Sequence, residues 1–235
     1  MIYTYTRKKF VFLIMTVALV VGFVGLLSVP TITHQKRLSG AVLKEEPELD
    51  KEVVAEITDS TATFNFDGTD FLVKDAIPEI NQLITDYYSA MMSFDMEWME
   101  SLVSDITRID QNLIRAKLEY IESISNIVCY TTEGPTEGTY RVYVYYDLKL
   151  KGIDTLAPAL SAMYLSQSSD GNYVIYLSEI DEDAQNFIDA ADSSIDVELL
   201  SSLVSERFNN VINSDAAMKE FYTMMETAMN SVPQQ

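Results

Sequence analysis

The chain has 235 residues, and 36 acidic against 16 basic side chains give it a formal net charge of −20 at pH 7. Nucleic-acid affinity comes mostly from Lys and Arg side chains that displace counterions, so this balance argues against nucleic-acid binding. The 14 Tyr and 10 Phe residues can build a core, which argues against a disordered chain. Cys129 is the only cysteine, so an intrachain disulfide is excluded, and its apolar surroundings favour a buried thiol over a reactive one.

An uncharged apolar run, Phe10–Val29, is about the length of a membrane-spanning helix. Arg7, Lys8 and Lys9 precede it directly, so the positive-inside bias places residues 1–9 in the cytoplasm and the remainder outside. A cleaved signal peptide is the competing interpretation, but the run is longer than usual for such peptides and no small-x-small site follows it. We therefore expect a single-pass signal-anchor at 10–29 and an extracytoplasmic location at the cell membrane.

The next two segments are a stalk and a hairpin. Residues 30–60 are polar and charge-dense, which is typical of a stalk, and they contain the only histidine, His34. Alternating runs at 63–66 and 69–73 flank Asp67-Gly68, a typical two-residue turn. The pattern predicts a β-hairpin within 61–74.

Three helices are predicted after the hairpin. The first begins at Pro78 and ends at about Met92, where Phe94-Asp95 interrupts it. Asp95 is placed to cap a second helix that ends at Val103, and a third is predicted over Asp110–Ile121. The first helix has the strongest helical spacing in the chain, with apolar residues at Ile80, Leu83, Ile84, Tyr87, Tyr88, Met91 and Met92.

The period then changes to that of strands, predicted at Ile127–Thr131, Tyr140–Leu150, Ala159–Ser166 and Tyr173–Leu177. In the longest strand, one face is fully apolar and the other is half aromatic and half charged. This pattern predicts an antiparallel sheet that is covered on one side and partly exposed, or pocket-lining, on the other. The apolar face carries Val142, Val144, Tyr146, Leu148 and Leu150; the opposite face carries Arg141, Tyr143, Tyr145, Asp147 and Lys149.

Residues 181–235 return to helical spacing in two apolar stripes. Two interpretations stay open: both helices pack on the domain, or the methionine-rich last helix binds a partner. The stripes are Leu200, Leu203, Val204, Phe208, Val211 and Ile212, and then Met218, Phe221, Tyr222, Met225 and Met229.

Motifs for common cofactors and metals are missing from this sequence. It has no phosphate-binding glycine motif, no zinc-binding histidine or cysteine spacing, and no glycine-centred calcium loop around the acids at 181–196. We therefore predict no catalytic residue, no metal site and no cofactor.

Three helices followed by a curved antiparallel sheet, with Tyr87, Tyr88, Ala90 and Asp95 on and after the first helix, resemble the nuclear transport factor 2-like superfamily. The resemblance covers about 76–180 and implies an α+β cone, with helices filling the concave face of a bent sheet. Together with the hairpin at 61–74 and the helical spacing after residue 180, it predicts a domain at 61–180 and a helical C-terminal extension at 181–235. A pocket at the open end of the cone would be lined by Tyr87, Tyr88, Trp98, Tyr143, Tyr145 and Leu160.

The same resemblance provides a test for catalysis. In steroid-isomerase-like members a first-helix tyrosine donates to an oxyanion, and Tyr87 stands at that position. The strand residue that would be the protonated acid is Leu160 here, and the dehydratase-like members need a histidine that the domain does not have. These departures favour a protein that is not an enzyme.

The sequence therefore predicts a non-enzymatic, membrane-tethered extracytoplasmic binding or interaction domain in the cell envelope. A first alternative is an assembly subunit of a secretion- or conjugation-type membrane complex, and a second is a cone-fold isomerase or lyase acting on a small molecule. The predicted partners are an envelope or membrane protein, a small apolar ligand, or a second copy in a homodimer.

Overall fold

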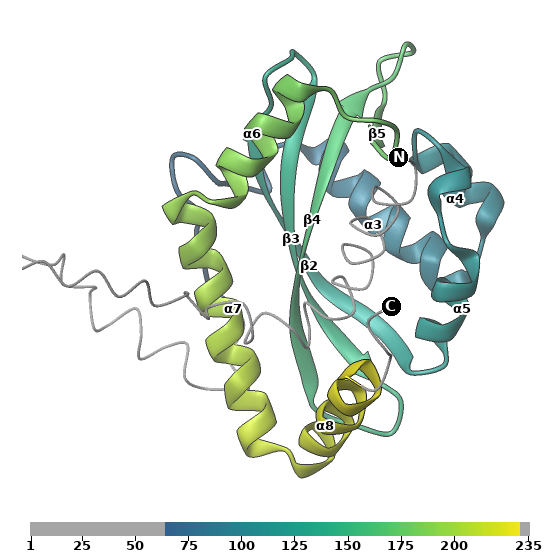
Figure 1. The fold of residues 1–235 in the computed structure, drawn as a ribbon, viewed down its shortest axis with the longest axis vertical. Helices are drawn as coiled ribbons and strands as arrows, with labels where there is room; N and C mark the ends of the chain where they lie inside the picture. Colours follow the sequence, from purple (N-terminus) through teal and green to yellow (C-terminus); the bar gives the residue numbers. More distant parts are fainter. Residues whose placement is uncertain (1–63, 231–235) are drawn as a thin grey trace, which may run out of the picture.

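The computed structural model describes residues 64–230 of the chain. Within this part, six α-helices and a five-stranded antiparallel sheet of order β1-β2-β3-β4-β5 form an α+β fold (Figure 1). The predicted anchor at 10–29 and stalk at 30–60 lie outside it. Between residues 64 and 230, no helix is both long and apolar enough to cross a membrane.

The first two helices form as predicted. α3 spans Pro78–Ser93, and Phe94 ends it in the left-handed conformation (φ 54°), with its N–H donating to the Ala90 and Met91 carbonyls. Asp95 then caps α4, Met96–Leu102, and its side chain accepts the Trp98 N–H at 2.9 Å.

The third helix is shorter than predicted. After a single 3-10 turn, η2 (Ile106–Arg108), α5 spans Gln111–Leu118, with Asp110 as its cap. Ile121, which we predicted at the end of this helix, instead begins β2, Ile121–Glu133, where it pairs with Leu150. β2 is longer than the predicted 127–131. The prediction is too short because two register shifts in β2 interrupt the alternation of its side chains, and Asn126, in the second of them, has a positive φ (51°).

The remaining strands are β3 (Thr139–Leu150), β4 (Leu156–Gln167) and β5 (Tyr173–Ile175). β1 has only two residues, Val73–Lys74, and pairs with Thr131 and Tyr130 of β2. The prediction of a turn at Asp67-Gly68 is wrong: Gly68 bridges Val73, and the chain reverses over 69–72. The Thr69 hydroxyl accepts the Phe71 and Leu72 N–H groups there, so a side-chain-supported turn replaces the two-residue one.

The apolar face of β3 forms the larger core, as predicted. It packs against α3, α4 and α5, which lie on one side of the sheet (Figure 1). Ile80 and Ile84 of α3 are fully buried in this cluster. Its β3 members are Val142, Val144, Tyr146, Leu148 and Leu150.

The opposite face of β3 is also covered, so the prediction of a partly exposed or pocket-lining face is wrong. Two C-terminal helices, α6 (Glu182–Asp192) and α7 (Ile195–Ser214), lie along this face (Figure 1). Phe64 and Phe66 join the same cluster, as do Val197, Leu200, Leu203 and Val204 of α7. Tyr143 and Tyr145 are therefore buried, because helices later in the chain cover the face that β3 alone would leave open.

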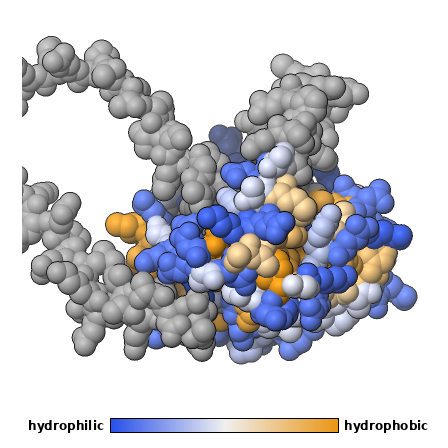
Figure 2. Space-filling view, turned by 90° about the horizontal axis from the view of Figure 1, so that it is seen from below, coloured by the Kyte–Doolittle hydropathy of each residue, from blue (hydrophilic) through white to orange (hydrophobic). Residues whose placement is uncertain are grey.

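The last helix, α8, spans Ala216–Asn230 and folds under one end of the sheet (Figure 1). Met218 is buried in the larger core, and Phe221 and Tyr222 pack against it. The first predicted stripe therefore packs on the domain, and so does the second as far as Tyr222. Figure 2 looks at the molecule from below and shows apolar side chains between hydrophilic ones; Met224 of α8 stays 49% exposed.

Candidate functional site

Four hydroxyl groups meet between α3 and the sheet. Tyr87 and Tyr88 come from α3, Tyr146 from β3 and Ser161 from β4. The Tyr88 and Ser161 hydroxyls are 2.7 Å apart and share a buried hydrogen bond. The Tyr88 ring packs 4.9 Å from that of Tyr146 and 5.6 Å from that of Tyr87. We call these four residues the hydroxyl cluster.

The hydroxyl cluster is neutral at physiological pH. Burial raises the pKa of Tyr87 and of Tyr88, and it raises the pKa of Tyr146 to about 12. Every neighbour that further shifts these pKa values is itself a Tyr or Ser hydroxyl. Such groups can exchange hydrogen bonds with a ligand, but they cannot accept a proton from carbon as a carboxylate base does.

Leu160 does not lie in this cluster. It pairs with Tyr145 and packs in the cluster under α7, while Ser161, which pairs with Val144, faces Tyr88. A shift of one residue along a strand moves a side chain to the other face. The prediction that Leu160 lines the same pocket as Tyr87 is therefore wrong, and Ser161 takes that position.

The other predicted pocket residues are also dispersed. Trp98 lies on α4 and is 37% exposed, while Tyr143 and Tyr145 face α6 and α7. Of the six residues, the structure brings together only Tyr87 with Tyr88, and separately Tyr143 with Tyr145 and Leu160.

A second set of polar groups is buried on the face toward α6. Arg141, 4% exposed, donates two hydrogen bonds to the Asp192 carboxylate, from Nε at 2.9 Å and from a terminal nitrogen at 2.7 Å. The Tyr143 hydroxyl donates to the same carboxylate at 2.6 Å. Burial, and then the Asp192 carboxylate, raise the pKa of Tyr143. This bidentate ion pair joins the end of α6 to β3.

The set continues along β3 at Tyr145. Its hydroxyl donates to Asp147, whose other carboxylate oxygen accepts the Asn126 side chain at 2.7 Å. Burial is the main cause that raises the pKa of Tyr145; Asp147 raises it further, and the buried Arg207 of α7 lowers it. Phe64 stacks on the Tyr145 ring at 4.0 Å. These polar side chains are hydrogen-bonded to one another and packed under apolar residues. We therefore interpret them as a network that stabilises the fold.

The sequence predicts the β3 part of this network. Alternation places Arg141, Tyr143, Tyr145 and Asp147 on one face of a strand, and the structure confirms it. Their partners Asp192, Asn126 and Arg207 come from a helix end, a bulge and a second helix, and no local spacing signals such contacts.

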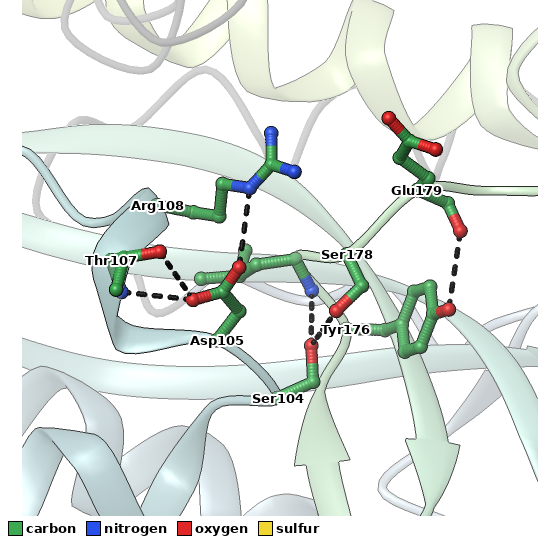
Figure 3. Close-up of polar contacts among 8 residues, drawn as sticks. Ser104, Asp105, Thr107, Arg108, Tyr176, Ser178 and Glu179 are labelled. Carbon is green, nitrogen blue, oxygen red and sulfur yellow. Dashed lines mark hydrogen bonds and ion pairs between the residues drawn. The ribbon is translucent and has the colours of Figure 1, made fainter.

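A third group of polar contacts lies beside β5 (Figure 3). The Ser104 hydroxyl accepts the Leu177 N–H at 2.8 Å and lies 3.2 Å from the Ser178 hydroxyl. Asp105 accepts from the Thr107 N–H and hydroxyl and from Arg108. The Asp105 bonds are local, whereas the Ser104 bonds join the connection after α4 to the segment that follows β5.

Cys129 is buried, as predicted. Burial, with a further contribution from Asp75, raises the pKa of its thiol to about 12, so the thiol is protonated at neutral pH. Among residues 64–230 no group of three or more His, Cys, Asp or Glu side chains is arranged to hold a metal ion.

Comparison with known proteins gives no assignment: no family model, no curated protein and no solved structure matches this chain.

Proposed function

We propose that this chain is a membrane-tethered extracytoplasmic interaction domain that binds a protein partner in the cell envelope and does not catalyse a reaction. The apolar run Phe10–Val29, with its preceding basic residues, would be the tether. The domain would be a cone of the nuclear transport factor 2-like type, in which α3, α4 and α5 cover one face of the sheet.

The observation that carries this proposal is the composition of the hydroxyl cluster. An isomerase of the cone type needs a tyrosine, a protonated acid and a carboxylate base around one ligand. Here Tyr87 and Tyr88 have Tyr146 and Ser161 as their polar neighbours, and Leu160 lies on the opposite face. The nearest buried carboxylate in β3, Asp147, lies on that opposite face with Tyr145.

The charge of the domain supports a protein partner. After residue 44 the chain has ten basic and 36 acidic residues. Four of the basic ones, Lys74, Arg108, Arg141 and Lys149, are already in ion pairs within the domain. The unpaired surface charge is therefore mostly negative, which favours a partner with a basic surface.

The test uses the full-length chain in its own membrane. A C-terminal reporter should be active only outside the cytoplasm, and cross-linking in intact cells should give one complex that survives purification at fixed stoichiometry. A matched variant, Leu200→Asp, disrupts the domain and leaves 10–29 intact; it should stay in the membrane and lose the complex. A cytoplasmic reporter would contradict the tether, and a purified chain that turned over small substrates without a partner would contradict the interaction role.

A further inference from the structure

The helix α6 buries fewer residues against the domain than α7, which follows it. Its buried residues are Ala184, Ile188 and Ala191, whereas α7 buries eight residues, six of them in the two large clusters. Ala184 and Ile188 belong to a separate small cluster with Tyr164 of β4. Phe187 of α6 adds a partly buried ring to this cluster, and α6 still buries fewer apolar residues than α7, so packing contributes less to its docking.

The end of α6 is also unfavourable on electrostatic grounds. Asp189 and Asp192 lie in its last turns, where the helix dipole disfavours negative charge, and no basic residue is present there. The Asp189 carboxylate accepts a hydrogen bond from the Gln185 side chain of the same helix, at 2.8 Å. Asp192 is different, because it receives two hydrogen bonds from Arg141 and one from Tyr143.

The segments on either side of α6 contain no helix or strand. Residues 176–181 precede it without regular structure, and only Ser193 and Ser194 separate it from α7. Ser194 caps α7 through the Val197 N–H, so α7 has its own start. Ile195 at that start is 79% exposed, so its side chain contributes little packing between α6 and α7.

We propose that α6 is a detachable helix: it leaves the sheet while the rest of the domain stays folded, and the Arg141–Asp192 ion pair sets how often this happens. Opening would expose Arg141, Tyr143 and Tyr164 together. These side chains offer a guanidinium, a hydroxyl and an aromatic ring, a surface suited to a carboxylate on an amphipathic segment. The inference concerns the motion of α6 alone and does not depend on the proposed function.

Native-state hydrogen exchange on the full-length chain in mild detergent tests this directly. Amides in α6 should exchange at least on the order of 10-fold faster than those in the middle of α7 and β3, and with little dependence on denaturant. If α6 amides exchange only with the global unfolding of the domain, the proposal is overturned.

Two variants that each remove one carboxylate from the end of α6 separate the ion pair from the helix dipole. Asp192→Asn should speed exchange in α6 on the order of 10-fold and leave the middle of α7 unchanged, because it loses charge-assisted bonds from Arg141. Asp189→Asn relieves the same dipole without touching Arg141, so exchange in α6 should stay the same or slow. Equal effects of both variants, or faster exchange throughout the domain in Asp192→Asn, would overturn the role of the ion pair.

Discussion

The two faces of the central strand β3 are both buried, but they are built differently. Toward α3 the face is apolar, and its polar groups are the neutral hydroxyls of Tyr146 and its neighbours. Toward α6 and α7 the face contains Arg141 and Asp147, each below 5% exposed and each hydrogen-bonded. Buried charged groups need hydrogen-bonding partners, so the second face requires specific polar residues from distant segments. The first face requires only apolar side chains that fill the space against α3.

This difference separates the roles of the C-terminal helices. α7 completes the second face as core, through Leu200 and Val204, and α6 adds a small apolar cluster and the Arg141–Asp192 ion pair. Residues 181–230 are therefore part of what buries the sheet, although the sequence suggests an extension after a finished domain.

The largest expected effect tests whether packing against α7 contributes as much to the free energy of unfolding as packing against α3. Leu200→Ala should lower the free energy of unfolding by about 2–5 kcal/mol, because a fully buried side chain leaves a cavity. Ile84→Ala, fully buried on the other face, should cost a similar amount in urea unfolding of the full-length chain. A cost for Leu200→Ala well below that of Ile84→Ala would show that α7 is an appendage.

A smaller effect is expected from the charged network. Asp147→Ala leaves the Tyr145 hydroxyl and the Asn126 amide without their acceptor, so it should destabilise the domain by about 1–3 kcal/mol. The exposed Asp154 gives a matched control: its ion pair with Lys149 lies at the surface, so Asp154→Ala should leave the urea midpoint nearly unchanged. If both variants behave alike, the buried network does not contribute to stability.

The smallest effects concern the hydroxyl cluster. They distinguish a packing role of its tyrosines from a catalytic one. Tyr88→Phe removes the buried bond to Ser161 and should cost about 1 kcal/mol in urea unfolding. Tyr87→Phe keeps the ring contact with Tyr88 and should change stability by less than about 0.5 kcal/mol. The isomerase alternative makes a different prediction, in which Tyr87→Phe abolishes an activity while stability is unchanged.

Local patterns predicted much of the fold correctly. The proline at 78, the interruption at Phe94 and the cap at Asp95 were sufficient to place α3 and α4, because helix termini are decided by backbone groups within a few residues. The two faces of β3 follow from alternation alone.

The errors arose where long-range contacts decide. Ile121 fits a helical stripe, yet pairing with Leu150 places it in β2. Leu160 was one residue out of register with the hydroxyl cluster, and register depends on the neighbouring strand. The turn at 69–72 replaces the expected Asp67-Gly68 turn because Thr69 supplies side-chain hydrogen bonds to it.

The sequence by itself determined which segments favour helix or strand and the acidic character of the chain. It also determined which side of each amphipathic helix or strand is apolar. These follow from side-chain chemistry and a fixed backbone period. Only the tertiary structure decided that the charged face of β3 is buried, that Ser161 rather than Leu160 faces Tyr88, and that Asp192 joins α6 to Arg141. Each of these depends on which distant segments come into contact, and hydrophobic burial favours such contacts without specifying them.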